Sequence, residues 1–181
     1  RNFSERTMSK IIDAVSIVMA CGDEIFAIQR QNFLTAFPGY WAFPGGKVEV
    51  GDESFSLEHP LTSSLEARLF GAAVREGQEE LGIDLRREII EGRVRNVDFL
   101  GLAITPDFNP FRFATYFFKI DFNEKVEFVV DRNEAFIAEW MRCDELLDQF
   151  KKGQILAVPP VVKVIETLSK APQTQEIKDL N

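Results

Sequence analysis

Short apolar runs separated by turn residues divide most of this chain into extended segments. Residues 14–20 (AVSIVMA) are apolar and partly β-branched, and Gly22-Asp23 predicts a turn into residues 24–30. Short runs bounded by turn residues favour strands over helices. Further extended segments are predicted at residues 41–44, 97–105, 112–122 and 136–142.

Three segments favour helices instead. They are residues 72–83, 143–152 and 161–170, and Pro159-Pro160 precedes the last of them as a helix start. Strands that alternate with helices predict an α/β fold. The length of 181 residues predicts one domain, over residues 8–170. The polar segment 171–181 is expected to fray.

Residues 72–83 (AAVREGQEELGI) contain the most informative group of side chains. In a helix, Glu76, Glu79 and Glu80 are spaced i, i+3 and i+4, so three carboxylates share one face. Their mutual repulsion destabilises the helix unless a divalent cation binds them, and Mg²⁺ or Mn²⁺ prefers such hard oxygen ligands. Arg75 can hold one carboxylate in place. A solvated acidic face is the alternative interpretation.

The preceding segment strengthens the metal-site interpretation. Residues 42–51 read AFPGGKVEVG, and the glycines after Pro44 permit a tight turn that leaves a carbonyl free to face an ion. Together with residues 72–83, this segment resembles the signature of the Nudix (MutT-like) hydrolases, G-x5-E-x7-R-E-U-x-E-E-x-G-U, where U is a bulky aliphatic residue. The matching positions are Gly46, Asp52, Arg75, Glu76, Glu79, Glu80, Gly82 and Ile83.

The chain departs from that signature in three places. Asp52 replaces a glutamate, Gly77 replaces the bulky aliphatic residue, and a segment spanning residues 53–70 is inserted between the two halves. The insertion predicts a loop through His59-Pro60. A helix is then expected to start at Thr62 or Ser63, because Ser63 and Glu66 form a capping-box pattern.

The resemblance implies a Nudix α/β/α sandwich, with a mixed sheet between helices. It also implies hydrolysis of a diphosphate linked to another moiety, assisted by Mg²⁺ or Mn²⁺. The implied catalytic residues are Arg75, Glu76 and Glu134, with Glu76 and Glu134 as alternatives for the general base. The implied metal ligands are the carbonyl of Gly45 and the carboxylates of Glu76, Glu79, Glu80 and Glu134.

Residues 104–118 (ITPDFNPFRFATYFF) and 153–162 (GQILAVPPVV) resemble the Nudix branch that includes the peroxisomal coenzyme A diphosphatases. This implies coenzyme A or its thioesters as substrate. The coenzyme A signature of other Nudix enzymes has a second arginine some residues beyond the first. This signature is not met here, because QNFLT follows Arg30. Other substrates remain open: ADP-ribose, nucleotide sugars or nucleoside triphosphates. So does a catalytically silent, nucleotide-sensing module. The candidate substrate-binding residues are Arg30, Phe108, Phe111 and Arg112.

The composition narrows the range of partners. A net charge of −8 argues against a protein that coats nucleic acid, and no apolar run is long enough to suggest a membrane span. Cys21 and Cys143 are far apart and lack metal-ligand spacing, which favours free thiols in a reducing cytoplasm. The expected partner is a small nucleoside diphosphate derivative, and a homodimer is left open.

Overall fold

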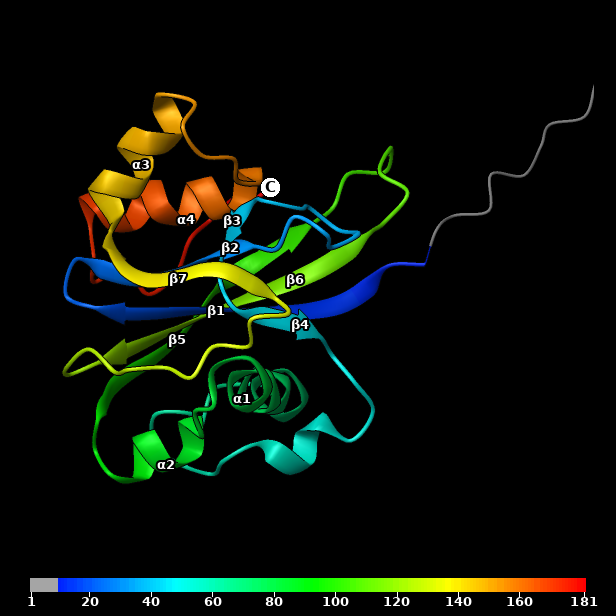
Figure 1. Ribbon diagram of the computed structural model, residues 1–181. Helices are drawn as coiled ribbons and strands as arrows, with labels where there is room; N and C mark the ends of the chain where they lie inside the picture. Colours follow the sequence, from blue (N-terminus) through cyan, green and yellow to red (C-terminus); the bar gives the residue numbers. More distant parts are fainter. Residues whose placement is uncertain (1–9) are drawn as a thin grey trace, which may run out of the picture.

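A computed structural model gives the arrangement of residues 10–181 (Figure 1). The strands are β1 (Ile12–Cys21), β2 (Glu24–Arg30), β3 (Trp41–Ala42), β4 (Gly45–Lys47), β5 (Val94–Ile104), β6 (Phe113–Phe122) and β7 (Ala135–Arg142). The α-helices are α1 (Ala67–Leu81), α2 (Leu85–Ile90), α3 (Cys143–Lys151) and α4 (Pro159–Lys170), and a 3-10 helix η1 spans Asp52–Phe55.

The strands form one mixed seven-stranded sheet in the order β3-β2-β1-β6-β5. β1 and β6 pair in parallel, and all other pairs are antiparallel. These pairs are β1 with β2, β2 with β3 and β5 with β6; outside the strand order, β4 pairs with β1 and β7 with β2. Helices α1 and α2 lie on one face of the sheet and α3 and α4 on the other (Figure 1). The predicted α/β/α sandwich is confirmed.

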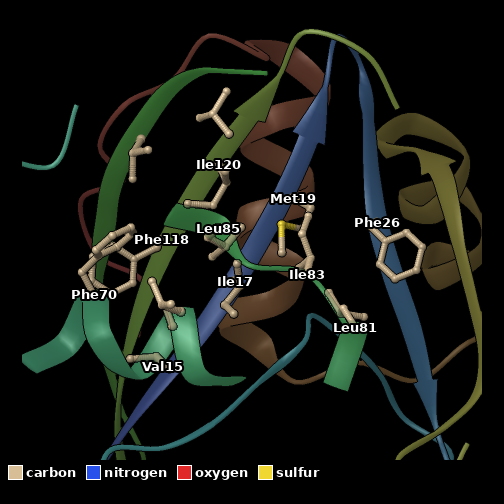
Figure 2. Packing of buried hydrophobic residues seen from close by; sticks show 14 of the residues in the cluster. Val15, Ile17, Met19, Phe26, Phe70, Leu81, Ile83, Leu85, Phe118 and Ile120 are labelled. Carbon is tan, nitrogen blue, oxygen red and sulfur yellow. The ribbon is translucent and has the colours of Figure 1, made fainter. Parts of the chain in front are cut away.

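Both faces of the central strand β1 are buried, which explains its continuous apolar run. Val15, Ile17 and Met19 belong to the core under α1, where Phe70 of the helix and Phe118 of β6 also pack (Figure 2). Val18 and Ala20 belong to a second core on the α3 and α4 side. The sheet therefore fixes α1 against one face, independently of the packing on the other.

The inserted segment differs from its prediction. Helix α1 begins at Ala67, and no side chain caps its N-terminus, so the predicted helix start at Thr62 or Ser63 is wrong. The Ser63 hydroxyl donates to the Pro60 carbonyl, and the Thr62 hydroxyl donates to the Leu57 carbonyl at 2.5 Å. These local bonds hold residues 57–63 in turns and compete with helix formation.

Two other parts of the chain were also not predicted. The short helix α2 follows α1 directly, and the Asp84 carboxylate caps it by accepting from the Arg86 amide at 3.1 Å. The segment 171–181 was expected to fray, but it packs on the sheet, where Ile177 and Leu180 are buried. The Ile177 amide donates to the Leu100 carbonyl of β5 at 2.6 Å.

The strand and helix predictions are otherwise confirmed within a few residues, apart from residues 41–44, which divide between β3 and β4. Residues 8 and 9 of the predicted domain lie outside the described residues. Within residues 10–181, no helix has both the length and the apolar character that crossing a membrane requires.

Candidate functional site

Helix α1 and strand β1 lie so close to β4 that only glycine fits at Gly45 and Gly46. A Cβ atom on Gly46 would lie 2.2 Å from Oε1 of Glu76, and one on Gly45 would lie 2.1 Å from the Val15 carbonyl oxygen. No side chain other than hydrogen can occupy these positions without displacing the backbone or the carboxylate. The Pro-Gly-Gly turn therefore lets the acidic face of α1 reach the strand.

Arg75 organises this face, and every N–H of its guanidinium has a partner. Nε and Nη2 donate to the two carboxylate oxygens of Asp52, at 2.7 and 3.2 Å. Nη1 donates to Glu76 at 2.9 Å and to Glu79 at 3.1 Å, and Nη2 also donates to the Lys47 carbonyl at 2.8 Å. The predicted orienting role of Arg75 thus has a geometric basis.

Asp52 is buried beneath this arginine. Burial alone would raise its pKa, but the hydrogen bonds from Arg75 and from the Glu49 amide outweigh that effect and hold the pKa of Asp52 below its ordinary value. Asp52 therefore stays ionised and neutralises Arg75. The carboxylates of α1 are then left with excess negative charge.

No ion pair among the described residues includes Glu80. Its only hydrogen-bond partner among the described residues is the Gly45 amide, at 3.2 Å. Burial raises the pKa of Glu80 to about 8, together with the nearby charges of Glu76 and Glu134 and against the hydrogen bond from Gly45. Burial also raises the pKa of Glu76, even though Arg75 opposes the shift. A positive charge at this position would relieve both carboxylates.

These residues fit a divalent cation by charge and by donor type. Three carboxylates, those of Asp52, Glu76 and Glu79, bond to a single guanidinium, Glu80 lies nearby with only an amide as its partner, and all of their donor atoms are hard oxygens. Across residues 10–181 no three acidic, histidine or cysteine side chains are already arranged as a metal site. In this structure Arg75 donates hydrogen bonds to carboxylate oxygens of Glu76 and Glu79, so these oxygens face the guanidinium. The proposed ligands, including the Gly45 carbonyl, stay predictions.

Glu134 and Arg30 lie near the same carboxylate, that of Glu80. The Asp131 amide donates to the Glu80 carbonyl at 2.8 Å, which brings the segment before β7 onto the end of α1. The charge of Glu134 raises the pKa of Glu80 and that of Arg30 lowers it, so both lie within electrostatic range. The structure therefore brings these two predicted residues to the cluster, while their chemical roles stay predictions.

The aromatic candidates lie in the loop between β5 and β6. Phe108 and Phe111 are 88% and 63% exposed. The Arg112 guanidinium is held locally, because Nε donates to the Thr105 carbonyl at 3.2 Å and Nη2 pairs with Asp107 at 2.5 Å. Within residues 10–181, no hydrogen bond or ion pair connects this loop with the carboxylates of α1. The substrate-binding roles of Phe108, Phe111 and Arg112 stay predictions.

Sequence reasoning missed Glu49. Its amide fixes Asp52 at 2.7 Å, and its carboxylate raises the pKa of Glu76. The available signal was an acidic residue three positions before Asp52 and three positions after Gly46. Glu49 therefore adds a further negative charge to the site.

No protein-family model and no curated protein matches the sequence. Solved structures do match. A NUDIX hydrolase from Alicyclobacillus acidocaldarius is 22% identical, with a TM-score of 0.77 over 92% of this chain and 94% of that one. The E. coli dihydroneopterin triphosphate pyrophosphohydrolase is 16% identical, with a TM-score of 0.58 over 89% and 99%.

A third match is part of a larger protein. The bifunctional NMN adenylyltransferase/ADP ribose pyrophosphatase from Francisella tularensis, complexed with AMP and a Mn ion, is 18% identical, with a TM-score of 0.60. The match covers 91% of this chain and 42% of that protein. Structural neighbours of this chain are thus Nudix and MutT proteins, and the chain has the Nudix fold.

Proposed function

We propose that this protein is a metal-dependent hydrolase that cleaves the diphosphate bond of a nucleoside diphosphate linked to another moiety. The observation that supports it most is the electrostatic imbalance on α1. Arg75 is fully used by its partners, while the half-buried Glu80 has no cationic partner among its hydrogen bonds and has a raised pKa. A structural ion pair would leave no such deficit of positive charge.

Each residue of the cluster has a separate task in this proposal. Glu76, Glu79 and Glu80 would hold Mg²⁺ or Mn²⁺, which when bound neutralises the diphosphate and lowers the pKa of a coordinated water. The Glu79 side chain is 58% exposed, so the cluster is accessible from solvent. Arg75, fixed by Asp52, keeps the carboxylates of Glu76 and Glu79 together.

Glu76 and Glu134 both remain alternatives for the general base. The raised pKa of Glu76 gives it a higher proton affinity than an ordinary carboxylate, which favours proton acceptance near neutral pH. Glu134 lies in the turn before β7, within electrostatic range of Glu80. Single substitutions of the two residues would separate their effects on turnover.

Coenzyme A or a coenzyme A thioester is the proposed substrate. Phe108 and Phe111 would supply exposed apolar contacts, and Arg30, near Glu80, would supply a cation for a phosphate. ADP-ribose is the second candidate, because a structural neighbour is named as an ADP ribose pyrophosphatase. Nucleotide sugars, nucleoside triphosphates and a silent nucleotide-binding module are further alternatives. A cytoplasmic location and a homodimer stay predictions.

A panel of diphosphates tests this proposal. Coenzyme A, ADP-ribose, a nucleotide sugar and a nucleoside triphosphate are assayed at equal concentration with Mg²⁺, Mn²⁺ or EDTA. We expect metal-dependent cleavage with coenzyme A fastest. Coenzyme A cleaved no faster than the others would refute the substrate, and binding without cleavage of any compound would favour the silent module.

A further inference from the structure

The segment before β7 is attached to the end of α1 by main-chain hydrogen bonds. The Asp131 amide donates to the Glu80 carbonyl at 2.8 Å, and the Val129 amide donates to the Leu81 carbonyl at 3.0 Å. These bonds satisfy carbonyl groups at the helix terminus that have no partner within the helix. They also fix the start of the turn that carries Glu134.

Glu134 follows within the same turn. The amides of Glu134 and Ala135 both donate to the Asp131 carbonyl, at 3.1 Å each. A carboxylate attached to this turn keeps its place relative to Glu80 only if the other end of the turn is fixed as well. The turn has no other attachment to α1 between Asp131 and Ala135 among the described hydrogen bonds.

Gln31 strengthens that second attachment, which begins with the pairing of Arg30 in β2 with Ala135 in β7. Its amide donates to the Glu134 carbonyl at 3.0 Å. Its side-chain Nε2 donates to the Arg132 carbonyl at 2.8 Å and to the Ala135 carbonyl at 3.4 Å. Within residues 10–181, no other side chain from outside the segment 129–136 donates a hydrogen bond to the main chain of this turn.

The place of Gln31 in the fold makes this attachment relevant to the site. It directly follows Arg30, the last residue of β2, where the pairing with β7 shifts register between Gln29 and Arg30. Such irregularities end regular pairing and redirect the chain. The hydrogen bonds of Gln31 therefore continue the attachment of β2 beyond the strand pairing, to the turn with Glu134 that precedes β7.

We infer that Gln31 is a positioning residue for the reaction, because its side chain fixes the turn that holds Glu134 beside Glu80. This inference rests on the proposed function. Gln31 itself contacts only main-chain carbonyls and needs no contact with substrate or cation. Loss of its side-chain donors should leave the fold intact but allow Glu134 to move away from the carboxylates of α1.

The test uses Gln31→Met, which keeps the length of the side chain and removes its donors without adding charge. Gln154→Met, at an exposed position after α3, is the matched control. We expect Gln31→Met to lower kcat by about tenfold with little change in KM, the size expected for hydrogen bonds that fix a reacting group. Mn²⁺ binding, followed by electron paramagnetic resonance, should weaken severalfold, and Gln154→Met should change neither.

A double-mutant cycle with Glu134→Gln separates positioning from a general structural role. If Gln31 acts through Glu134, Gln31→Met should have little further effect on kcat or Mn²⁺ binding when Glu134→Gln is present. Additive effects, or unchanged kcat and Mn²⁺ affinity in either single variant, would overturn the inference. Failure of the wild type to cleave any diphosphate with Mg²⁺ or Mn²⁺ would instead overturn the proposed function.

Discussion

Two buried ionic clusters lie on opposite faces of the sheet, and they differ in what remains unpaired. On the α1 face, Arg75 is bonded to Asp52, Glu76 and Glu79. On the other face, Lys119 of β6 is fully buried and pairs with Asp121 at 3.3 Å. Both clusters place a cation among carboxylates within the protein interior.

In the Lys119 cluster, formed by Lys119, Asp98 and Asp121, the ammonium group has no free donor. Its ammonium group donates to the carbonyls of Pro172 and Thr174, at 2.9 and 2.8 Å, in addition to Asp121. An ammonium has three N–H donors, so these partners satisfy it fully. The cluster therefore fastens the C-terminal segment to the sheet and offers nothing to a ligand.

The Arg75 cluster is open by comparison. Glu80 is half-buried with an amide as its partner, and the Glu79 side chain is 58% exposed. The comparison teaches that burial of a charged group does not by itself indicate a functional site. What marks the α1 face is a carboxylate, Glu80, without a cationic partner among its hydrogen bonds, beside a solvent-exposed Glu79.

Removing carboxylates from α1 should have the largest effect on activity. Glu79→Gln and Glu80→Gln keep the shape of the side chains but remove a charge from the proposed cation site. We expect each to lower kcat by at least about a hundredfold on the best substrate. Lys119→Met, assayed at a temperature where it remains folded, should keep kcat within about threefold, an energy difference below about 1 kcal/mol. Similar losses in all three variants would remove the distinction between the clusters.

The largest loss of stability should come from substituting Lys119, in the cluster on the sheet face opposite α1. Lys119→Met leaves Asp98 and Asp121 buried without their cation and releases the carbonyls of Pro172 and Thr174. Breaking a buried pair in this way costs about 3–5 kcal/mol in free energy of unfolding. Urea denaturation measures it, and hydrogen exchange at the Ile177 amide reports release of the tail. A change below about 1 kcal/mol would show that the tail packs without the lysine.

The pH dependence of the free energy of unfolding should report the raised pKa of Glu80 in the Arg75 cluster. Glu80 has a pKa of about 8 in the folded protein and 4.5 as its ordinary value, so the folded state binds the extra proton between these limits. Its contribution is therefore fully present below about pH 4.5 and is lost as the pH rises through about 8, on the order of a few kcal/mol. Urea denaturation in EDTA at pH 5, 6.5 and 8 measures this loss.

Glu80→Gln is the control for that slope, since Glu76, Asp98 and Asp121 also have raised pKa values. The variant should lose much less stability between pH 5 and 8 than the wild type. Added Mg²⁺ should stabilise the wild type at pH 8, because a ligand bound only by the folded state shifts the equilibrium. An unchanged slope in Glu80→Gln would place the titrating groups elsewhere.

The smallest effect is expected at Gly77, one of two glycines within α1 whose surroundings differ. A Cβ on Gly77 would meet Ile83 and Leu85 at 3.6 Å, an ordinary contact, so Gly77→Ala should stabilise the protein by up to about 1 kcal/mol with unchanged kcat. A Cβ on Gly71 would lie 1.8 Å from the Asp52 carbonyl oxygen. Gly71→Ala should therefore displace Asp52 and lower both stability and kcat. Equal behaviour of the two variants in thermal unfolding and turnover would refute this assignment.

The features that the sequence predicted correctly depend on residues close together in the chain. The strands follow from apolar runs, and the grouping of Glu76, Glu79 and Glu80 follows from helical spacing, which needs no knowledge of the fold. The start of α1 was placed wrongly because turn hydrogen bonds of Ser63 and Thr62 compete with the capping pattern.

The features that were missed depend on partners far apart in the sequence. Lys119 bonds to main-chain carbonyls more than fifty positions away, and main-chain acceptors leave no signal in a sequence. The same applies to Gln31, whose side chain donates to the main chain around Glu134. Tertiary contacts of this kind follow from the pairing of β2 with β7, which composition and periodicity do not specify.

Binding of a divalent cation to the protein in the absence of substrate tests the central claim most directly. Cation-free protein is titrated with Mn²⁺ at pH 7.5 by isothermal titration calorimetry, alongside Glu79→Gln, Glu80→Gln and Lys119→Met. Saturable binding by the wild type and Lys119→Met, with at least tenfold weaker binding by the two glutamine variants, is the predicted result. Equal affinity in all four proteins, or no saturable binding by the wild type, would contradict a cation site on α1.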